Sequence, residues 1–257
     1  MERRLDALAY PDVQEYLAHG TDLAILPLGA VEQHGPHCPL GTDAYIARSI
    51  AEGVAEKLGA VLLPTQWYGV SRHHMTFPGS LTIRPQILQG LLEDLLESLI
   101  HHGFKKILIL NGHGGNTACI TSAFSEIRGS HPDIFMAQSS VWLALADEYP
   151  QLPEEMRQKN FRTMVSHGGL LETSLVMAVA PGTVNLKRAQ PISVDKYVLG
   201  TDPSMSVALR MLDLSPIGSN GDPRESNPRF GQEFLNRSID ALVRKYREAV
   251  KAFVDGG

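Results

Sequence analysis

Carboxylates and imidazoles gather in one short stretch of this sequence. Glu32, His34 and Asp43 lie close together in the chain, with glycines and prolines between them. When side chains of these types converge, they are natural ligands for Zn²⁺, Mn²⁺ or Fe²⁺. Glu32 and His34 are two positions apart, so on an extended segment both side chains point to the same side. Taken alone, the stretch is equally compatible with a helix-capping aspartate and two surface residues in a loop.

Two later segments place further histidines and a carboxylate beside glycines. Residues 111–116, NGHGGN, directly follow the apolar run ILIL and contain His113. A glycine-rich turn after a strand lies at the carboxyl edge of a parallel sheet, where open α/β sheets have their sites. Residues 166–174, SHGGLLETS, contain His167 and Glu172 at the expected start of a helix. Separately, His113 could be a solvated turn residue and Glu172 a carboxylate favoured by the helix dipole. Three such clusters together favour a metal centre.

The elements that must position these residues alternate between strands and helices. Apolar runs predict strands over residues 22–28, 61–64, 105–110 and 134–138. Helical periodicity predicts helices over residues 43–58, 85–102, 116–128 and 231–254. This alternation predicts an α/β protein with three layers, α/β/α, around a mostly parallel central sheet. A chain of 257 residues with 43% hydrophobic content fits one such domain over residues 1–257. The polar stretch 147–162 predicts a surface excursion or a lid.

Composition narrows the class of protein. The net charge is −5, and lysines and arginines are scattered without a basic stripe, so we expect no nucleic-acid binding. No run approaches the ~20 apolar residues of a membrane helix, and the charged N-terminus has no apolar stretch after it. Cys38 and Cys119 lack CxxC spacing, as is typical of the reducing cytoplasm. We therefore expect a cytoplasmic protein that does not bind or cross a membrane.

The three clusters together resemble the motifs of a known family. EQHGPHCPLGTD, NGHGGN and HGGLLETS, in this order and spacing, are similar to those of the creatininase family of metal-dependent amidohydrolases. Residues 73–83, HHMTFPGSLTI, and 221–224, GDPR, resemble further family segments, so the resemblance covers most of the chain. The family includes creatininase, a formamide hydrolase, a peptidase that matures mycofactocin, and relatives acting on oxidised inositol rings. The resemblance implies a two-metal site at the carboxyl ends of a parallel sheet.

The family pattern also implies a set of ligands for two divalent metal ions per chain, Zn, Mn or Fe. Asp43 is expected to bridge the ions, because the loop that carries it returns toward the first two ligands. Glu32, Asp43 and His113 would hold one ion. His34 and Asp43 would hold the other, with Glu172 as a less certain third ligand.

Other residues take supporting or catalytic roles in this prediction. His167 matches the catalytic histidine of the family and is expected to be the acid/base. A role as a metal ligand and a purely structural role at a helix start are the alternatives. Ser71, His74 and Gly114 are expected to bind the substrate, and His37 to support the ligands. Cys38, within the first motif, is interpreted as a packing residue.

The sequence departs from creatininase at two places. That enzyme has a glutamate where Gly115 stands, and tryptophans before its catalytic histidine where residues 162–165 read RTMV. Creatinine is therefore not the expected substrate. We expect a metal-dependent amidohydrolase that cleaves the C–N bond of a cyclic amide or formamide in a small molecule, not a peptide bond.

Several alternatives remain open from the sequence. The chain could be a creatininase-like peptidase of peptide-cofactor maturation or a ring-opening hydrolase of an oxidised cyclitol. It could also cleave another carbon–carbon bond or a phosphoester, or be a non-catalytic α/β binding protein. The resemblance further implies a homo-oligomer, a hexamer. Apolar residues in an irregular loop could form either an interface or a pocket wall. These residues are Trp67, Tyr68, Met75 and Phe77.

Overall fold

Four parallel strands form the centre of the molecule, in the order β2-β1-β3-β4. The computed structural model describes residues 2–157, 161–192 and 208–255. The strands are β1 (Leu23–Leu28), β2 (Val61–Leu62), β3 (Lys106–Asn111) and β4 (Phe135–Ser140). Leu28 pairs with Asn111, and Asn111 pairs with Ser140, so the three longer strands end flush at one edge. The loops that leave this edge therefore begin side by side.

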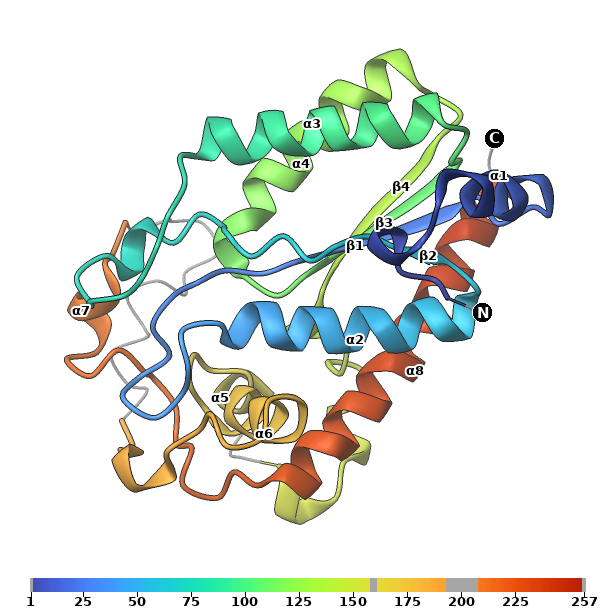
Figure 1. Cartoon of the computed structure of the whole chain (residues 1–257). Coiled ribbons are helices and arrows are strands. Elements are labelled where there is room, and N and C mark those ends of the chain that lie inside the picture. The colour runs from blue at the N-terminus through green and yellow to red at the C-terminus, as the bar shows by residue number, and fades with distance from the viewer. Residues whose placement is uncertain (1, 158–160, 193–207, 256–257) are drawn as a thin grey trace.

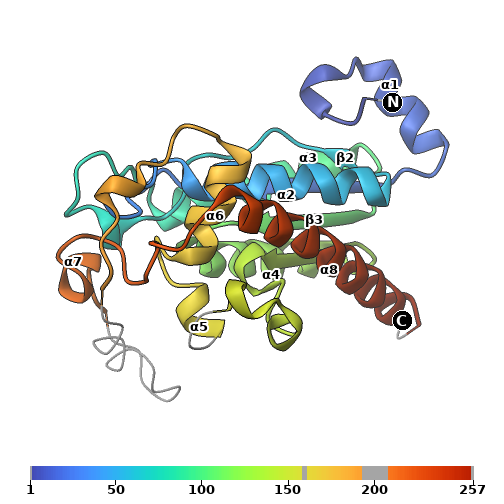
Figure 2. The ribbon, with the colours of Figure 1, turned by 90° about the horizontal axis from the view of Figure 1, so that it is seen from below.

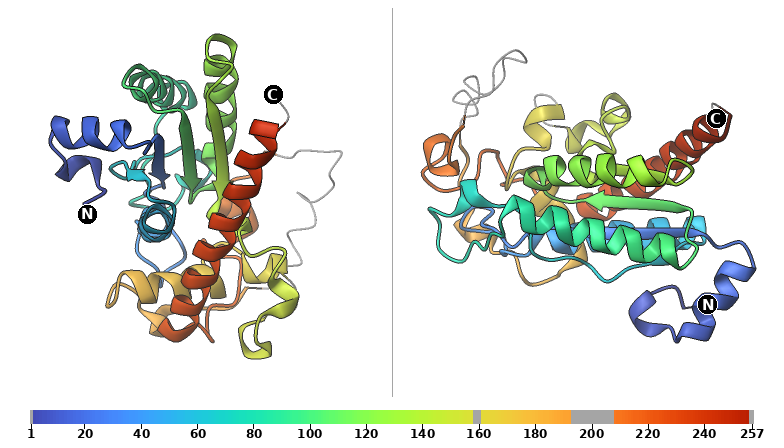
Figure 3. Two further views of the ribbon diagram at one scale, coloured as in Figure 1. Left: turned by 90° about the vertical axis from the view of Figure 1, so that its right-hand side faces the viewer. Right: turned by 90° about the horizontal axis from the view of Figure 1, so that it is seen from above.

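Helices cover both faces of this sheet (Figures 1 and 3). One face carries α3 (Pro85–His101) and α4 (Thr117–Ser130), and α1 (Tyr10–Ala18) joins their core through Tyr16. The other carries α2 (Thr42–Leu58), α6 (Leu170–Val179) and α8 (Pro228–Asp255). The short helices α5 (Phe161–Met164) and α7 (Met211–Leu214) complete the described set. The predicted three-layer α/β/α fold is confirmed, and no helix in the described ranges is long and apolar enough to cross a membrane.

Alternation along the strands explains why two separate cores form. In β1, Leu23 and Ile25 pack in the core under α2, α6 and α8, whereas Ala24 and Leu26 pack in the core under α3 and α4. The neighbouring strand β3 repeats this pattern. Successive side chains of a strand point to opposite faces, so a fully apolar strand needs cover on both. Figure 2 shows α2, α6 and α8 together on one side of the sheet.

The boundaries differ from the predicted ones mostly at the ends of elements. The second strand is only Val61–Leu62, at the edge of the sheet, and α8 begins at Pro228 rather than at residue 231. Helix α1 was not predicted; it spans only nine residues, and only one of its side chains is buried. The predicted excursion or lid is described over residues 147–157. It contains two single turns of 3-10 helix, and Leu152 and Met156 are buried in the core under α2, α6 and α8. Residues 158–160 lie outside the described part.

Candidate metal centre

All five predicted ligands lie at the carboxyl edge of the sheet, opposite the end of the molecule where the two termini lie (Figure 1). Glu32 and His34 follow β1, Asp43 lies in the first turn of α2, His113 follows β3, and Glu172 lies in the first turn of α6. Each of these side chains is at most 5% exposed. Five buried polar side chains from different segments thus converge in one place, as the sequence motifs predict.

The NGHGGN motif is fastened to its neighbours by its own side chains. Asn111 Oδ1 accepts the N–H of His113 at 3.1 Å. The Asn116 amide donates to Gly29 O at 3.0 Å and accepts the N–H of Val70 at 3.0 Å. A Cβ at Gly112 would lie 2.5 Å from the backbone oxygen of Asp43, so only glycine lets this turn approach the start of α2 so closely. The motif therefore holds His113 beside Asp43.

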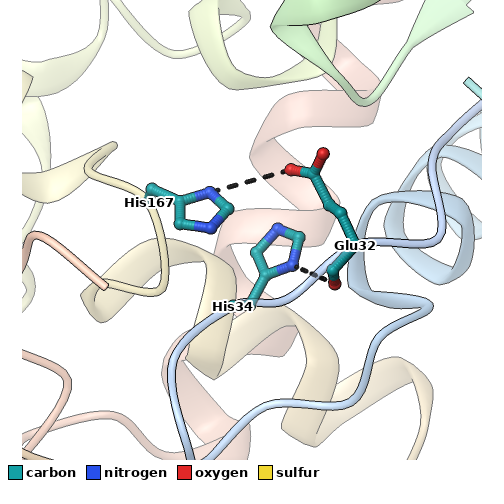
Figure 4. Close-up of side chains that lie close together, drawn as sticks. All are labelled: Glu32, His34 and His167. Atoms are coloured by element: carbon teal, nitrogen blue, oxygen red, sulfur yellow. Dashed lines mark hydrogen bonds and ion pairs between the residues drawn. The ribbon is translucent and has the colours of Figure 1, made fainter. Parts of the chain in front are cut away.

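Asp43 belongs to two sets of converging ligand atoms. Glu32, Asp43 and His113 offer atoms that lie within 4.8 Å of one another, and so do His34, Asp43 and Glu172. This grouping is the one that the family resemblance implies, with Asp43 shared. A third set combines Glu32 and His34 with His167 (Figure 4). His167 therefore lies close enough to act as a ligand itself, which is an alternative to its predicted acid/base role.

The two predicted histidine ligands are oriented by backbone carbonyls. His34 Nε2 lies 3.0 Å from Asp43 Oδ1, while its Nδ1 lies 3.1 Å from Glu32 O. His113 Nδ1 lies 3.2 Å from Glu32 Oε1, while its Nε2 lies 3.0 Å from Val70 O. A carbonyl can only accept, so in the neutral ring the carbonyl-facing nitrogen carries the hydrogen and the other nitrogen has a free lone pair. That is how proteins orient imidazoles toward a metal ion.

The buried carboxylates of the cluster are stabilised by positive charge beside them. Burial lowers the pKa of His34, but the neighbouring Asp43 and then Glu172 outweigh it and raise this pKa to about 10. Burial would raise the pKa of Glu32 and Asp43, yet the facing imidazoles hold both below their usual values. Burial raises the pKa of Glu172 to about 8. Three buried carboxylates therefore depend on neighbouring cations for their charge.

Two buried oxygens of this cluster lack a hydrogen bond. Glu32 Oε2 has no partner, and Asp43 Oδ2 has none either, although His113 Nδ1 lies 3.3 Å away without hydrogen-bond geometry. An unsatisfied carboxylate oxygen in the interior is destabilising unless a cation binds it. The donors are oxygen and nitrogen without a thiolate, a set that suits Zn, Mn or Fe(II). The residues present thus fit divalent ions.

His167 lies beside the cluster, on the loop before α6. Its Nδ1 is 3.9 Å from Glu32 Oε1 (Figure 4), and its Nε2 is 2.7 Å from Gln33 O. Burial, together with the charge on His34, lowers the pKa of His167 to about 3. Gly168, next in the chain, donates its N–H to Glu172 Oε2 at 2.6 Å. The predicted ligand Glu172 therefore also holds the loop that carries His167.

Two further residues of the first motif, His37 and Cys38, contact the segment around this loop. His37 Nε2 lies 3.1 Å from both Gly168 O and Thr173 Oγ1, so His37 contacts the loop rather than the predicted ligands. Cys38 Sγ lies 3.4 Å from the same Thr173 hydroxyl, and burial raises the pKa of its thiol to about 12. Both residues lie outside the converging groups found among the described residues.

A cavity of about 300 Å³ opens beside these ligands. Of the predicted substrate-binding residues, His74 and Gly114 line it. Ser71 is fully buried behind His113, with its Oγ 3.5 Å from His113 Nε2, so its substrate role stays a prediction. The sequence interpretation missed four lining residues, namely His73, Trp142, Met211 and Leu214. Trp142 closely follows the end of β4, as His113 closely follows the end of β3. The expectation that site residues lie just after parallel strands could therefore have identified Trp142.

Gly115 lies where the backbone turn has no room for a side chain. A Cβ at this position would lie 2.3 Å from Val70 O and 2.4 Å from His113 Nε2, distances that real Cβ atoms do not reach. The hydrogen bond between His113 and Val70 occupies the space in which a side chain would begin. This packing therefore requires glycine at position 115. Val165, two residues before His167, lines the cavity.

Comparison with known proteins assigns the family. The sequence profile described as "Creatinine amidohydrolase", of the creatininase family, matches residues 6–246. The chain belongs to the creatininase family. It is 29% identical over 256 residues to the creatinine amidohydrolase of Pseudomonas putida, covering 94% of this chain and 95% of that one. It is 30% identical to the mycofactocin precursor peptide peptidase of Mycolicibacterium smegmatis, covering 86% and 85% of the two chains.

Solved structures agree with this family assignment. A creatininase described as the Mn form superposes with a TM-score of 0.85 over 96% of this chain and 98% of its own, at 23% identity, which shows a shared fold. A related creatininase is described as a Zn-Zn type. The resemblance drawn from the three motifs is confirmed, and the protein is a creatininase-family hydrolase. The ligand roles of individual residues stay predictions.

Proposed function

We propose that this protein is a metal-dependent amidohydrolase that cleaves a C–N bond other than a peptide bond in a small molecule, a cyclic amide or a formamide. The observation that carries the proposal is the position of Asp43, shared between two sets of buried ligand atoms beside a small cavity. A carboxylate that reaches two such sets is suited to bridging two ions.

The residues divide naturally between two ions. Glu32, Asp43 and His113 would hold one, and His34, Asp43 and Glu172 the other. Bound there, Zn, Mn or Fe(II) would supply a nucleophilic water at neutral pH and polarise the carbonyl group of the substrate. The unsatisfied oxygens of Glu32 and Asp43 support this division, because each residue has a free lone pair for an ion.

The proton steps belong to His167. Water adds its oxygen to the carbonyl carbon and the C–N bond breaks, so one proton must pass from water to the leaving nitrogen. His167 lines the same cavity, and its Nδ1 lies 3.9 Å from Glu32 Oε1, beside the predicted metal ligands. A group so placed can take the proton and then deliver it. The alternative is that His167 is a metal ligand, and substitution of this residue distinguishes the two roles.

The shape of the cavity favours a small substrate. A volume of about 300 Å³ lies at the lower end of the range for ligand pockets. Trp142, Met211 and Leu214 supply apolar wall, while His73 and His74 supply polar wall. The sequence departs from the creatininase pattern at Gly115 and over residues 162–165, so we do not propose creatinine as the substrate.

An activity screen tests the proposal. The protein is loaded separately with Zn²⁺, Mn²⁺ and Fe²⁺ and assayed on cyclic amides, formamides and short peptides, with Asp43→Asn as the matched inactive control. We expect turnover of a cyclic amide or a formamide. Hydrolysis of peptides alone would replace the proposal with a peptidase, a function carried by the mycobacterial relatives. Turnover that survives in Asp43→Asn would count against a metal mechanism.

We also propose that the protein is a homo-oligomer, a hexamer, in the cytoplasm. Tyr68 and Met75 are 49% and 50% exposed, and neither lines the cavity, nor do Trp67 and Phe77. Of the two roles that the sequence left open for these residues, an interface fits better than a pocket wall. Light scattering at micromolar concentration should give a mass several times 28.1 kDa. A monomer would contradict this prediction, and Tyr68→Lys should reduce the mass if the patch is the interface.

A further inference from the structure

Gln33 is a buried amide that lies between the two predicted ligands Glu32 and His34 in the chain. Its side chain is only 5% exposed and contacts three groups from distant segments and one backbone group nearby in the chain. Nε2 lies 3.0 Å from Gly218 O, 2.7 Å from His74 Nδ1 and 3.1 Å from His167 Nε2. Oε1 accepts the N–H of Gly35 at 3.0 Å. The amide thus joins two histidines that line the cavity.

Two backbone hydrogen bonds fix the orientation of the Gln33 side-chain amide. The N–H of Gly35 can only donate, so the atom beside it must be the amide oxygen. Gly218 O can only accept, so the atom beside it must be the amide nitrogen. A Cβ at Gly218 would lie 1.9 Å from Gln33 Oε1, so the backbone of Gly218 packs directly against the amide. Rotating the amide by 180° would therefore break both backbone hydrogen bonds.

This orientation determines where the two histidines carry their hydrogens. Gln33 Nε2 has two hydrogens, one for Gly218 O and one for His74 Nδ1, so His74 must accept at Nδ1 and carry its own hydrogen on Nε2. His167 Nε2 lies 2.7 Å from the backbone oxygen of Gln33 and must donate to it. Its 3.1 Å contact with the amide nitrogen is then a contact between two donors, not a hydrogen bond.

We propose that Gln33 is a positioning residue that fixes the tautomers of His74 and His167. Its amide and its backbone oxygen leave His167 with an unprotonated Nδ1, 3.9 Å from Glu32 Oε1, and His74 with a hydrogen on Nε2, 3.3 Å from the same oxygen. Nδ1 of His167 is then the atom that accepts a proton. This inference deepens the acid/base role of His167 and rests on the proposed function only for its kinetic consequence.

The direct test is the tautomer of each ring in the zinc-loaded protein. Histidine labelled with ¹⁵N distinguishes protonated from unprotonated ring nitrogens by chemical shift, and the variants His74→Asn and His167→Asn identify the two sets of signals. We expect the hydrogen on Nε2 and an unprotonated Nδ1 in both rings. A hydrogen on Nδ1 of either ring would overturn the proposal.

The variant Gln33→Glu tests the role of the amide itself. A carboxylate oxygen would then face His74 Nδ1, so the hydrogen of His74 should move to Nδ1. We expect kcat to fall about 10- to 100-fold, the effect typical of residues that orient a site, with little change in KM. The matched control is Ser80→Ala, which removes the acceptor of the Gln33 backbone N–H at 3.1 Å but leaves the amide intact. It should keep the wild-type tautomers and kcat.

The outcomes separate this inference from the proposed function. An unchanged His74 tautomer in Gln33→Glu would overturn the role of Gln33. If that variant does not fold, Gln33→Met, of similar length and without hydrogen bonds, should give His74 a mixture of tautomers; a single unchanged tautomer would again overturn the role. Expected tautomers in a wild-type protein that hydrolyses no amide would refute the proposed function while leaving the arrangement of the rings intact.

Discussion

Two cavities at different places in this molecule contain acidic and histidine side chains, and only one has the features of a site. The cavity beside α1 is the larger, about 570 Å³, and its lining includes Glu2, Asp12, Glu15 and His19. All four of these residues are exposed. The cavity at the carboxyl edge of the sheet is about 300 Å³, and the carboxylates that line it are buried, as are His74 and His113.

The difference lies in what the carboxylates contact. In the cavity beside α1, Glu2 accepts the N–H of Arg3 at 2.8 Å and Asp12 accepts the N–H of Ala9 at 2.8 Å, so local backbone satisfies both. In the carboxyl-edge cavity, Glu32 and Asp43 each keep a buried oxygen without a hydrogen bond. Unsatisfied, buried charge is destabilising and persists where a ligand offsets it. The larger cavity volume is therefore not what indicates the functional site. The proposed site rests instead on buried carboxylate oxygens that have no hydrogen bond.

The largest effect is expected from Asp43→Ala, which tests this distinction directly. Removing the shared carboxylate should abolish turnover and release both metal ions, because Asp43 belongs to both sets of ligand atoms. Elemental analysis of protein purified without chelator should fall from close to two ions per chain to none. A variant that kept the full complement would exclude Asp43 as the bridge.

Substitution of His167 should separate proton transfer from metal binding. His167→Ala should keep its metal ions and melting temperature while kcat falls about 10²–10⁴-fold, since it removes an acid/base and no ligand. Loss of metal with a lower melting temperature would instead make His167 a ligand, in the set it forms with Glu32 and His34. Unchanged activity and metal content would leave it a structural residue at a helix start.

Two adjacent glycines of the carboxyl-edge cavity should respond differently to the same change. Gly115→Ala places a methyl group against Val70 O and His113 Nε2, so we expect a loss of about 1–3 kcal/mol in the free energy of unfolding. Gly114→Ala is the matched control, since a Cβ there meets nothing within 4 Å. Chemical denaturation of both variants measures the difference. Equal stabilities would contradict the tight packing of this turn.

The smallest effect is expected in the cavity beside α1. Glu15→Gln removes an exposed charge from its lining and should change the free energy of unfolding by less than about 0.5 kcal/mol. Metal content and turnover should equal those of the wild type. A clear loss of activity would mean that the larger cavity has a function after all, and the comparison between the two cavities would fail.

The sequence was most informative about the fold where apolar patterns are long. Helix α3 was predicted within one residue, because its leucines repeat at three and four over its whole length. The strands β1 and β3 were also predicted within one residue, since both are continuous apolar runs. Helix α1 was missed because its burial depends on Tyr16 packing against a core built by distant segments. Short 3-10 turns, such as Arg72–His74, carry no periodic signal.

The same division holds for the site. Residue types and glycine-rich spacing identified Glu32, His34, Asp43, His113 and Glu172 as residues that would gather, because loops after parallel strands meet at one edge of the sheet. Sequence order did not reveal Gln33 as the link between His74 and His167. Nor did it reveal that Met211 and Leu214 line the cavity, since no local pattern relates α7 to the strand ends.

By itself, then, the sequence determined the layers of this protein, its family and the chemical types at its centre, because these follow from local periodicity and from motifs a few residues long. The tertiary structure alone decided which buried oxygens stay unsatisfied and which ring nitrogen of each histidine faces a carboxylate. Those properties depend on distances between residues far apart in the chain, such as Gln33 and Gly218. Only the packing of the loops at the carboxyl edge fixes such distances.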